Sequence, residues 1–151
     1  MKYLITALLG LFFVLPASGQ QQPVEWSFFS KKLNNREHEI HLVATIDRGW
    51  HIYAQSSSTK GPSPVIIRFS PSPAITFHKG IKEEGELLKK KNIEGVNVRY
   101  FENQVIFIQK ITITGIAATV KGSVTFVAAS GSQILPSQTV DFSIIPAQEI
   151  Q

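Results

Sequence analysis

The amino-acid sequence predicts an all-β protein, an antiparallel β-sandwich of about eight or nine short strands. The first observation is an alternation of apolar and polar residues with a period of two, which is clearest between Ile40 and Ile46. The second is the placement of turn-forming residues, which separate the alternating runs roughly every eight to twelve residues. The third is that the sequence contains no convincing long helix, internal repeat or interdomain linker. A β-barrel is the second architecture that fits this pattern.

The expected strands of the first half are short runs bounded by Asn, Asp, Gly, Ser or Pro, which favour turns. Asn34-Asn35 and Asp47-Arg48-Gly49 supply two of these turns. Residues 54–64 are rich in serine, with a glycine and two prolines, and predict a loop of roughly ten residues that is either functional or merely mobile. The expected strands are residues 24–28, 39–46, 50–53, 65–69 and 75–77.

Residues 79–94 carry an acidic run followed by a basic run, and two structures fit them. This order of charges suits a helical turn, because acidic groups near the start and basic groups near the end complement the helix dipole. Gly85 interrupts the run, so a strand-flanked loop fits as well. Further strands are expected at residues 96–100 and 105–113.

The segment 124–144 predicts an antiparallel hairpin with one buried face. Period-two alternation occurs on both sides of a break at residues 129–137. The break contains Gly131, which can adopt a positive φ, and Pro136, which sits where no ladder N–H is needed.

Length and composition indicate one globular domain, which we place at residues 20–151. The chain has 151 residues, of which 43% are hydrophobic and 17% charged, and it contains no cysteine. A domain of ~130 residues buries enough surface to need no disulfide or metal. The formal charge is +4 with dispersed basic residues, so nucleic acid is not expected as a partner.

Residues 1–19 have the three parts of a secretory signal peptide. Met1-Lys2 is a positive start, Leu4 to Leu15 is an apolar run, and Ala17-Ser18-Gly19 is a small-residue cleavage site. The apolar run has about 12 residues, which is short of the ~20 needed to span a membrane. We therefore expect a mature chain that starts near Gln20, is exported and soluble, and has no transmembrane span.

No combination of residues in the sequence predicts a catalytic, metal or cofactor site. The four histidines do not form a zinc-binding motif, and no cysteine accompanies them. Neither a nucleophile-elbow motif nor a glycine-rich phosphate loop occurs. The sequence therefore predicts no catalytic residue, no metal and no cofactor. The histidines are His38, His41, His51 and His78.

Two features have both a structural and a functional interpretation. Trp50 and Tyr53 are expected to pack in the core, with a contact surface shared with residues 56–64 as the alternative. The lysines at 89–91 could contact anionic lipid or an acidic partner, but three lysines beside three glutamates more often form a solvated face.

Three segments together, Gly49 to Tyr53, Gly95 to Phe107 and Val124 to Ile144, resemble the N-terminal domain of the thiol:disulfide interchange protein DsbD. The resemblance runs from about Pro23 to Ile145 and implies an immunoglobulin-like sandwich. That family carries two cysteines, four or five residues apart, which pass electrons from a membrane domain to periplasmic partners.

The positions that match those cysteines are Ala129 and Ile134, the second of which precedes Leu135-Pro136. Because a thiolate is needed for thiol–disulfide exchange, the family's chemistry is not expected here.

The function predicted from the sequence is an exported, non-redox interaction module rather than an enzyme. Its partner is expected to be another exported or membrane protein, and the sequence leaves the oligomeric state open. Two alternatives are an accessory part of a thiol:disulfide interchange system and a carrier of a small ligand between the sheets. The candidate contact residues are Trp50, Tyr53, Ser132, Gln133, Leu135 and Pro136.

Overall fold

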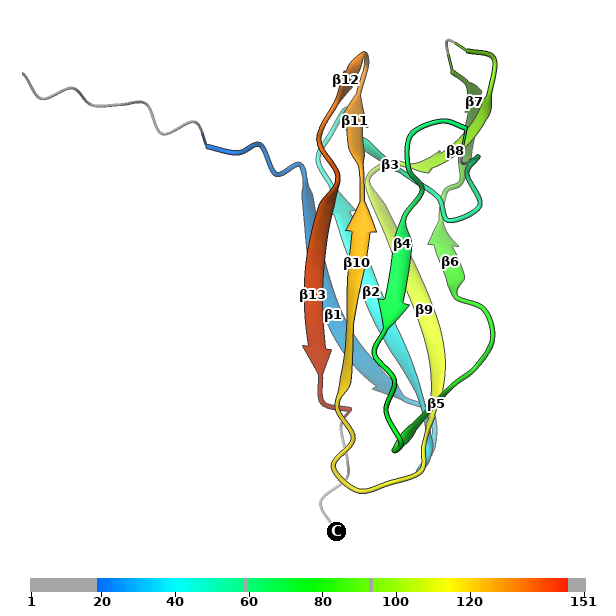
Figure 1. Ribbon diagram of the computed structural model, residues 1–151, viewed down its shortest axis with the longest axis vertical. Coiled ribbons are helices and arrows are strands. Elements are labelled where there is room, and N and C mark those ends of the chain that lie inside the picture. Colours follow the sequence, from blue (N-terminus) through cyan, green and yellow to red (C-terminus); the bar gives the residue numbers. More distant parts are fainter. Residues whose placement is uncertain (1–18, 59, 93, 147–151) are drawn as a thin grey trace, which may run out of the picture.

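The computed structural model describes residues 19–58, 60–92 and 94–146, and these residues form an antiparallel β-sandwich without helices (Figure 1). The predicted all-β, immunoglobulin-like fold class is confirmed. Apart from Gly19, the predicted signal peptide lies outside the described residues. The strands are β1 (Val24–Lys32), β2 (Glu37–Ile46), β3 (His51–Tyr53), β4 (Ile66–Phe69), β5 (Ile75–Phe77), β6 (Lys82–Gly85), β7 (Leu88–Lys91), β8 (Asn97–Phe101), β9 (Gln104–Ile113), β10 (Val120–Phe126), β11 (Ala128–Ser130), β12 (Gln133–Ile134) and β13 (Gln138–Ile144).

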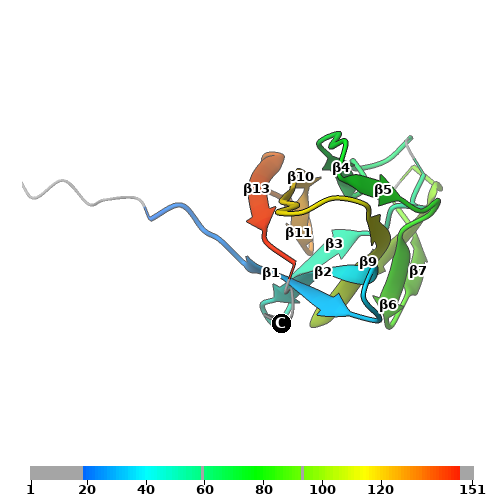
Figure 2. The ribbon, with the colours of Figure 1, turned by 90° about the horizontal axis from the view of Figure 1, so that it is seen from below.

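The described strands are arranged in three sheets. The main sheet has the order β1-β2-β9-β5, and β6 also pairs with β9. The facing sheet has the order β13-β10-β4, and Figure 2 shows it across the sandwich from β1, β2 and β9. The end sheet, β12-β11-β3-β8-β7, lies at the top of Figure 1. The end sheet carries the cavity described below.

The core lies between the main and facing sheets, because alternate residues of their strands point inward. On β2, Ile40 and Leu42 are fully buried, as the sequence pattern predicts. Trp26 of β1 packs on Phe107 of β9 and on Phe126 of β10, with ring centroids 6.0 and 5.4 Å apart. Each large side chain buried in this way contributes about 1.5–3 kcal/mol to folding.

The predicted hairpin forms from β10 and β13 and continues beyond the facing sheet. Val124 and Val140 are directly opposite each other, and both belong to or pack against the core. Pairing with β13 ends at Phe126, and after Val127 the chain continues as β11 of the end sheet. The tip of the hairpin, β11 and β12, therefore extends past the sandwich (Figure 1).

The charged segment 79–94 forms two short strands rather than a helical turn. β6 pairs with β9, and β7 pairs with β8, so the backbone of this segment completes two sheet edges. Gly85 suits this arrangement, because an added Cβ would lie 3.0 Å from the Gln104 carbonyl oxygen. Short strands here and at the hairpin tip bring the described residues to thirteen strands, more than the eight or nine expected from the sequence.

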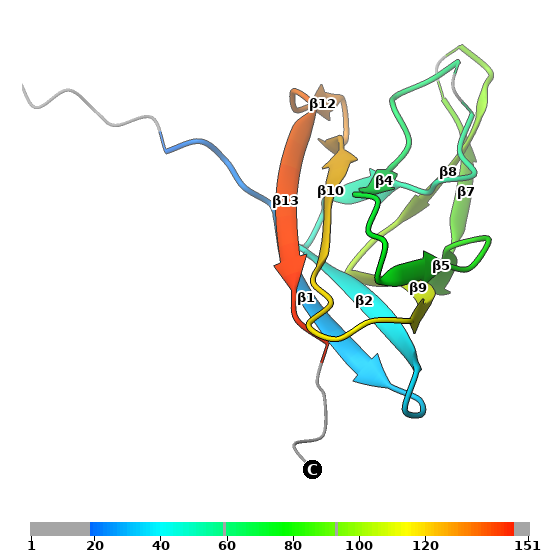
Figure 3. The ribbon, with the colours of Figure 1, turned by 60° about the horizontal axis from the view of Figure 1, so that its bottom comes forward.

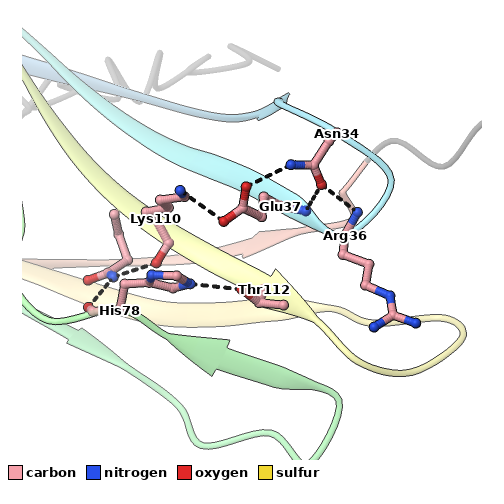
Figure 4. A network of polar contacts seen from close by, with 7 residues as sticks. Asn34, Arg36, Glu37, His78, Lys110 and Thr112 are labelled. Carbon is pink, nitrogen blue, oxygen red and sulfur yellow. Dashed lines mark hydrogen bonds and ion pairs between the residues drawn. The ribbon is translucent and has the colours of Figure 1, made fainter.

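At the opposite end of the sandwich, polar groups fix the turn between β1 and β2 to β9 (Figure 4). The Asn34 side-chain oxygen accepts from the backbone N–H groups of Arg36 and Glu37, at 3.0 and 2.9 Å. The Glu37 carboxylate pairs with the Lys110 ammonium at 2.9 Å, and these contacts lower the pKa of Glu37, chiefly through Lys110. His78 bonds to the Thr112 hydroxyl at 2.8 Å. This network stabilises a solvent-exposed turn and has no feature of a binding site.

Candidate functional site

A cavity of about 770 Å³, here called the end cavity, lies at the end of the sandwich. Of its described lining residues, only Leu135 also packs against the main core, whose side chains fill the space between the main and facing sheets. Segments far apart in the sequence form its walls: the loop after β3, the β7–β8 arm and the β11–β12 tip. The lining residues are Tyr53, Lys60, Gly61, Pro62, Ser63, Lys90, Lys91, Asn92, Glu94, Val98, Val127, Gly131, Ser132, Ile134 and Leu135.

The floor of the end cavity is a small apolar cluster of its own. Tyr53, Val98, Val127 and Ala129 are buried together, with the half-buried Tyr100 packed against them. They come from the adjacent strands β11, β3 and β8 and from Val127, which directly precedes β11, and the sheet brings them together because alternate residues share a face. An apolar floor below an open mouth is the usual construction of a ligand or partner site.

A buried histidine–tyrosine pair lies beside this floor. The His51 Nε2 and the Tyr53 hydroxyl oxygen are 3.2 Å apart. Burial, with a smaller contribution from the nearby Lys90 charge, lowers the pKa of His51 to about 4. Burial also raises the pKa of Tyr53. Both groups are therefore uncharged at neutral pH, and the pair serves as an internal hydrogen bond rather than as an acid or base at the cavity.

The β7–β8 arm brings positive charge to the mouth of the cavity. The Lys90 ammonium lies 4.7 Å from the centroid of the Tyr100 ring, and that ring packs on His51 with centroids 4.9 Å apart. Lys91 also lines the cavity, whereas Lys89 does not. All three lysines are exposed, as expected of a solvated face, but two of them line the end cavity.

The loop after β3 is anchored at its base and lines the cavity beyond that point. The Ala54 N–H donates to the Arg99 carbonyl at 2.9 Å, and the Arg99 N–H donates to the Ser57 hydroxyl at 3.2 Å. The Val65 N–H donates to the Tyr53 carbonyl at 3.0 Å, which closes the loop. The described part of residues 54–64 contains no strand, in agreement with the predicted loop.

The predicted contact residues fall into three places. Tyr53, Ser132 and Leu135 line the end cavity. Gln133 and Pro136 are exposed on the same hairpin tip but are not among the lining residues. Trp50 is buried in the main core, away from the cavity lining, as the packing interpretation expects. No group of three or more potential metal ligands occurs within the described residues.

Comparison with known proteins relates the fold, but not the sequence, to characterised domains. No protein-family model and no curated protein match the sequence. The structure is similar to the N-terminal periplasmic domain of ScsB from Proteus mirabilis, with a TM-score of 0.55 and 15% identity over 82% of this chain. The chain spans 45% of that ScsB domain.

The structure is also similar to the reduced N-terminal domain of Neisseria meningitidis DsbD. The TM-score is 0.54 and the identity 9%, over 82% of this chain and 85% of that one. The fold is that of the DsbD N-terminal domain. A further structure, a complex between the N-terminal domains of DsbD and PilB from the same organism, has a TM-score of 0.48 and 10% identity over 87% of each chain.

In this DsbD-like fold, the two positions at which the sequence resemblance places the family's cysteines face each other across the hairpin tip. Ala129 of β11 is directly opposite Ile134 of β12. The Leu135 N–H donates to the Ala128 carbonyl at 2.9 Å, so the next pair, Ala129–Ile134, is a non-hydrogen-bonded pair with closely spaced side chains. Ala129 is 1% exposed and Ile134 is 56% exposed. The geometry of a cross-strand pair is present, and the chain has no cysteine to use it.

Sequence reasoning considered Lys90 and Lys91 as a partner contact but preferred a solvated face, and it did not single out Lys60 or Val98; all four residues line the cavity. For Val98, the sequence does contain a signal, because the period-two alternation of β8 places this residue on the buried face of the strand. The positions of the lysines depend on how β7 and the loop after β3 lie against the hairpin tip, and no local pattern reports this.

Proposed function

We propose that this protein is an exported interaction module that contacts another envelope protein at the end cavity. The observation that carries the proposal is the convergence of the loop after β3, the β7–β8 arm and the β11–β12 tip on one cavity of about 770 Å³. Loops held at one end of a rigid sandwich are common positions for recognition sites. A ligand between the sheets is less well supported, because side chains of the main core fill that space.

We further propose that the protein is not an enzyme and performs no thiol–disulfide exchange. The chain contains no cysteine, and thiolate attack on a disulfide requires one. The buried, uncharged His51–Tyr53 pair has no neighbouring nucleophile to activate. Purified protein should therefore not accelerate the reduction of insulin disulfides, even when a reductant able to reduce the cysteines of a DsbD-type domain is present. Measurable insulin reduction above the protein-free rate contradicts this part of the proposal.

Export is supported by the signal-peptide pattern of residues 1–19 and by the likeness to a ScsB domain described as periplasmic. Among the residues that the structure describes, no helix is long and apolar enough to cross a membrane. The partner would accordingly be met outside the cytoplasm, either as another exported protein or as the exposed part of a membrane protein.

Photocrosslinking in intact cells tests the proposed contact. A photoreactive residue at Ser132, which is exposed and lines the cavity, should give a discrete crosslinked product with a second protein. The same residue at Asn35, which is exposed on the turn between β1 and β2, is the control and should give no such product. Equal products from both positions, or none from Ser132, contradict the proposal.

A further inference from the structure

The two edge strands of a single sheet line the end cavity together. The end sheet runs β12-β11-β3-β8-β7, so β12 and β7 are its first and last strands. Ile134 of β12 and Lys90 and Lys91 of β7 nevertheless line the same cavity. The end sheet is therefore bent, so that its two edge strands lie on either side of the cavity. Figures 1 and 3 show the β11–β12 tip and the β7–β8 arm as two projections at the same end of the molecule. Within the described sheet, each edge strand has a single hydrogen-bonded neighbour.

The charge around this space is predominantly positive. Lys60, Lys90 and Lys91 line the cavity against a single acidic residue, Glu94. Lys60 comes from the loop after β3 and the other two from β7, so the lysines belong to two of the cavity walls. No ion pair joins these three lysines to other described residues. Lys90 has a cation–π contact with the Tyr100 ring but no carboxylate partner, and lysines that lack a carboxylate partner around a cavity favour an anionic occupant.

The floor and the size of the cavity define the rest of the occupant. Val98 and Val127 provide a buried apolar surface, and Ile134 and Leu135 extend it to the rim. A volume of about 770 Å³ lies in the range of sites that hold drug-sized ligands, so the enclosed part of an occupant is of that size. An occupant that complements this lining carries an apolar group for the floor and anionic groups for the rim.

We propose that the end cavity binds an extended acidic peptide segment of a partner protein, with an apolar side chain on the Val98–Val127 floor and carboxylates near Lys60, Lys90 and Lys91. The two sheet edges favour a peptide over a lipid, because an extended backbone can use unpaired strand groups that an acyl chain cannot. This inference rests on the proposed function and specifies the chemistry of the partner at the same cavity.

Fluorescence anisotropy with two labelled peptides tests the charge requirement. One peptide alternates Glu and Leu over eight residues, and the other replaces every Glu with Gln. The purified protein should bind the Glu peptide at least about tenfold more tightly, and raising the salt from about 0.05 M to 0.5 M should reduce that difference. Equal affinity for the two peptides, or a difference that salt leaves unchanged, overturns the proposal.

Matched lysine variants test the location. The double variant Lys60→Gln/Lys91→Gln should bind the Glu peptide about tenfold more weakly, since each exposed ion pair contributes a fraction of the total. The control Lys79→Gln/Lys121→Gln removes the same charge from exposed positions outside the cavity lining and should bind like the unaltered protein. An equal loss in both variants means that the net charge, not the cavity, attracts the peptide, and overturns the proposal.

Together with a fatty-acid binding test, these experiments distinguish a lipid occupant of the cavity from a failure of the proposed function. If dodecanoate binds the cavity and the Glu peptide does not, the peptide inference is wrong. If Ser132 crosslinks to a partner but the Glu peptide does not bind, the inference fails while the proposed function stands. If the Glu peptide binds and Ser132 yields no crosslink, the acidic-peptide site stands and the envelope contact does not.

Discussion

The facing pair Ala129–Ile134 predicts that a disulfide can be installed at the hairpin tip. These residues form a non-hydrogen-bonded antiparallel pair, for which the Cα atoms are typically about 4.5 Å apart. That separation lies within the usual range for disulfides, and the side chains of directly opposite residues project to the same face. The double variant Ala129→Cys/Ile134→Cys should therefore oxidise to a monomeric, intramolecular disulfide.

The expected stabilisation follows from the length of the closed loop, which is about six residues. The chain-entropy relation gives about 2 kcal/mol for such a loop at 25 °C, or roughly 6–10 °C in Tm for a domain of this size. Comparing the oxidised and reduced forms of the same variant cancels the effect of the two substitutions themselves. The Ile134 side chain is more than half exposed, so a sulfur atom at this position meets little steric hindrance.

Thiol titration and urea denaturation of both forms provide the measurement. The control Ala129→Cys/Gln133→Cys places the second thiol on the opposite face of β12 and should keep both thiols free under the same oxidant. Failure of the 129–134 pair to oxidise, or an oxidised form less stable than its reduced form, refutes the register of the hairpin tip.

Three further predictions concern the fold and the buried histidine. Phe107→Ala should cost about 3–5 kcal/mol in urea denaturation, because the ring is fully buried against Trp26 and Phe101, and a cost below about 1 kcal/mol contradicts this packing. Gly85→Ala should cost about 1–3 kcal/mol, because its Cβ would press on the Gln104 carbonyl, and an unchanged denaturation midpoint contradicts this close approach. Lowering the pH from about 6.5 to 4 should destabilise the protein by up to about 3 kcal/mol through His51, because the unfolded state takes up a proton that the folded state resists. His51→Phe should remove most of this slope in a urea series across that pH range, and an unchanged slope assigns the effect to other groups.

The alternating strands could be predicted from the sequence because each carries its own pattern of apolar and polar residues. The strand from Ile40 onward has one face in the core, so its period-two pattern is complete within the strand itself. The segment around Gly85 lacks such a pattern, because β6 and β7 are held by edge pairing with β9 and β8 and most of their side chains stay exposed. β6 depends on β9, which is distant in the sequence, and β7 pairs with the neighbouring β8 through mostly exposed, charged residues. A helical turn fitted the local charges equally well.

The candidate site was predictable only where it coincides with a strand end or a turn. Tyr53 and Leu135 could be singled out, because an aromatic strand end and a Leu-Pro step after a turn are visible in the sequence. In the sequence, Lys90 and Lys91 belong to a group of three lysines beside three glutamates, a pattern that indicates a solvated face. Their role at the cavity depends on the bend of the end sheet, which brings its first and last strands to one space.

The lysines of β7 that we propose select an acidic partner would also protect this edge of the end sheet from self-association. An exposed sheet edge invites pairing with another copy of the chain, and short strands or lysines prevent it. Here β12 has two residues and β7 carries Lys89, Lys90 and Lys91. Two β7 edges from different copies would repel each other, whereas an acidic strand would be attracted to either. Protection of the edge and the proposed preference for an acidic partner would therefore follow from one arrangement of charge, and a variant that neutralises β7 should weaken both together.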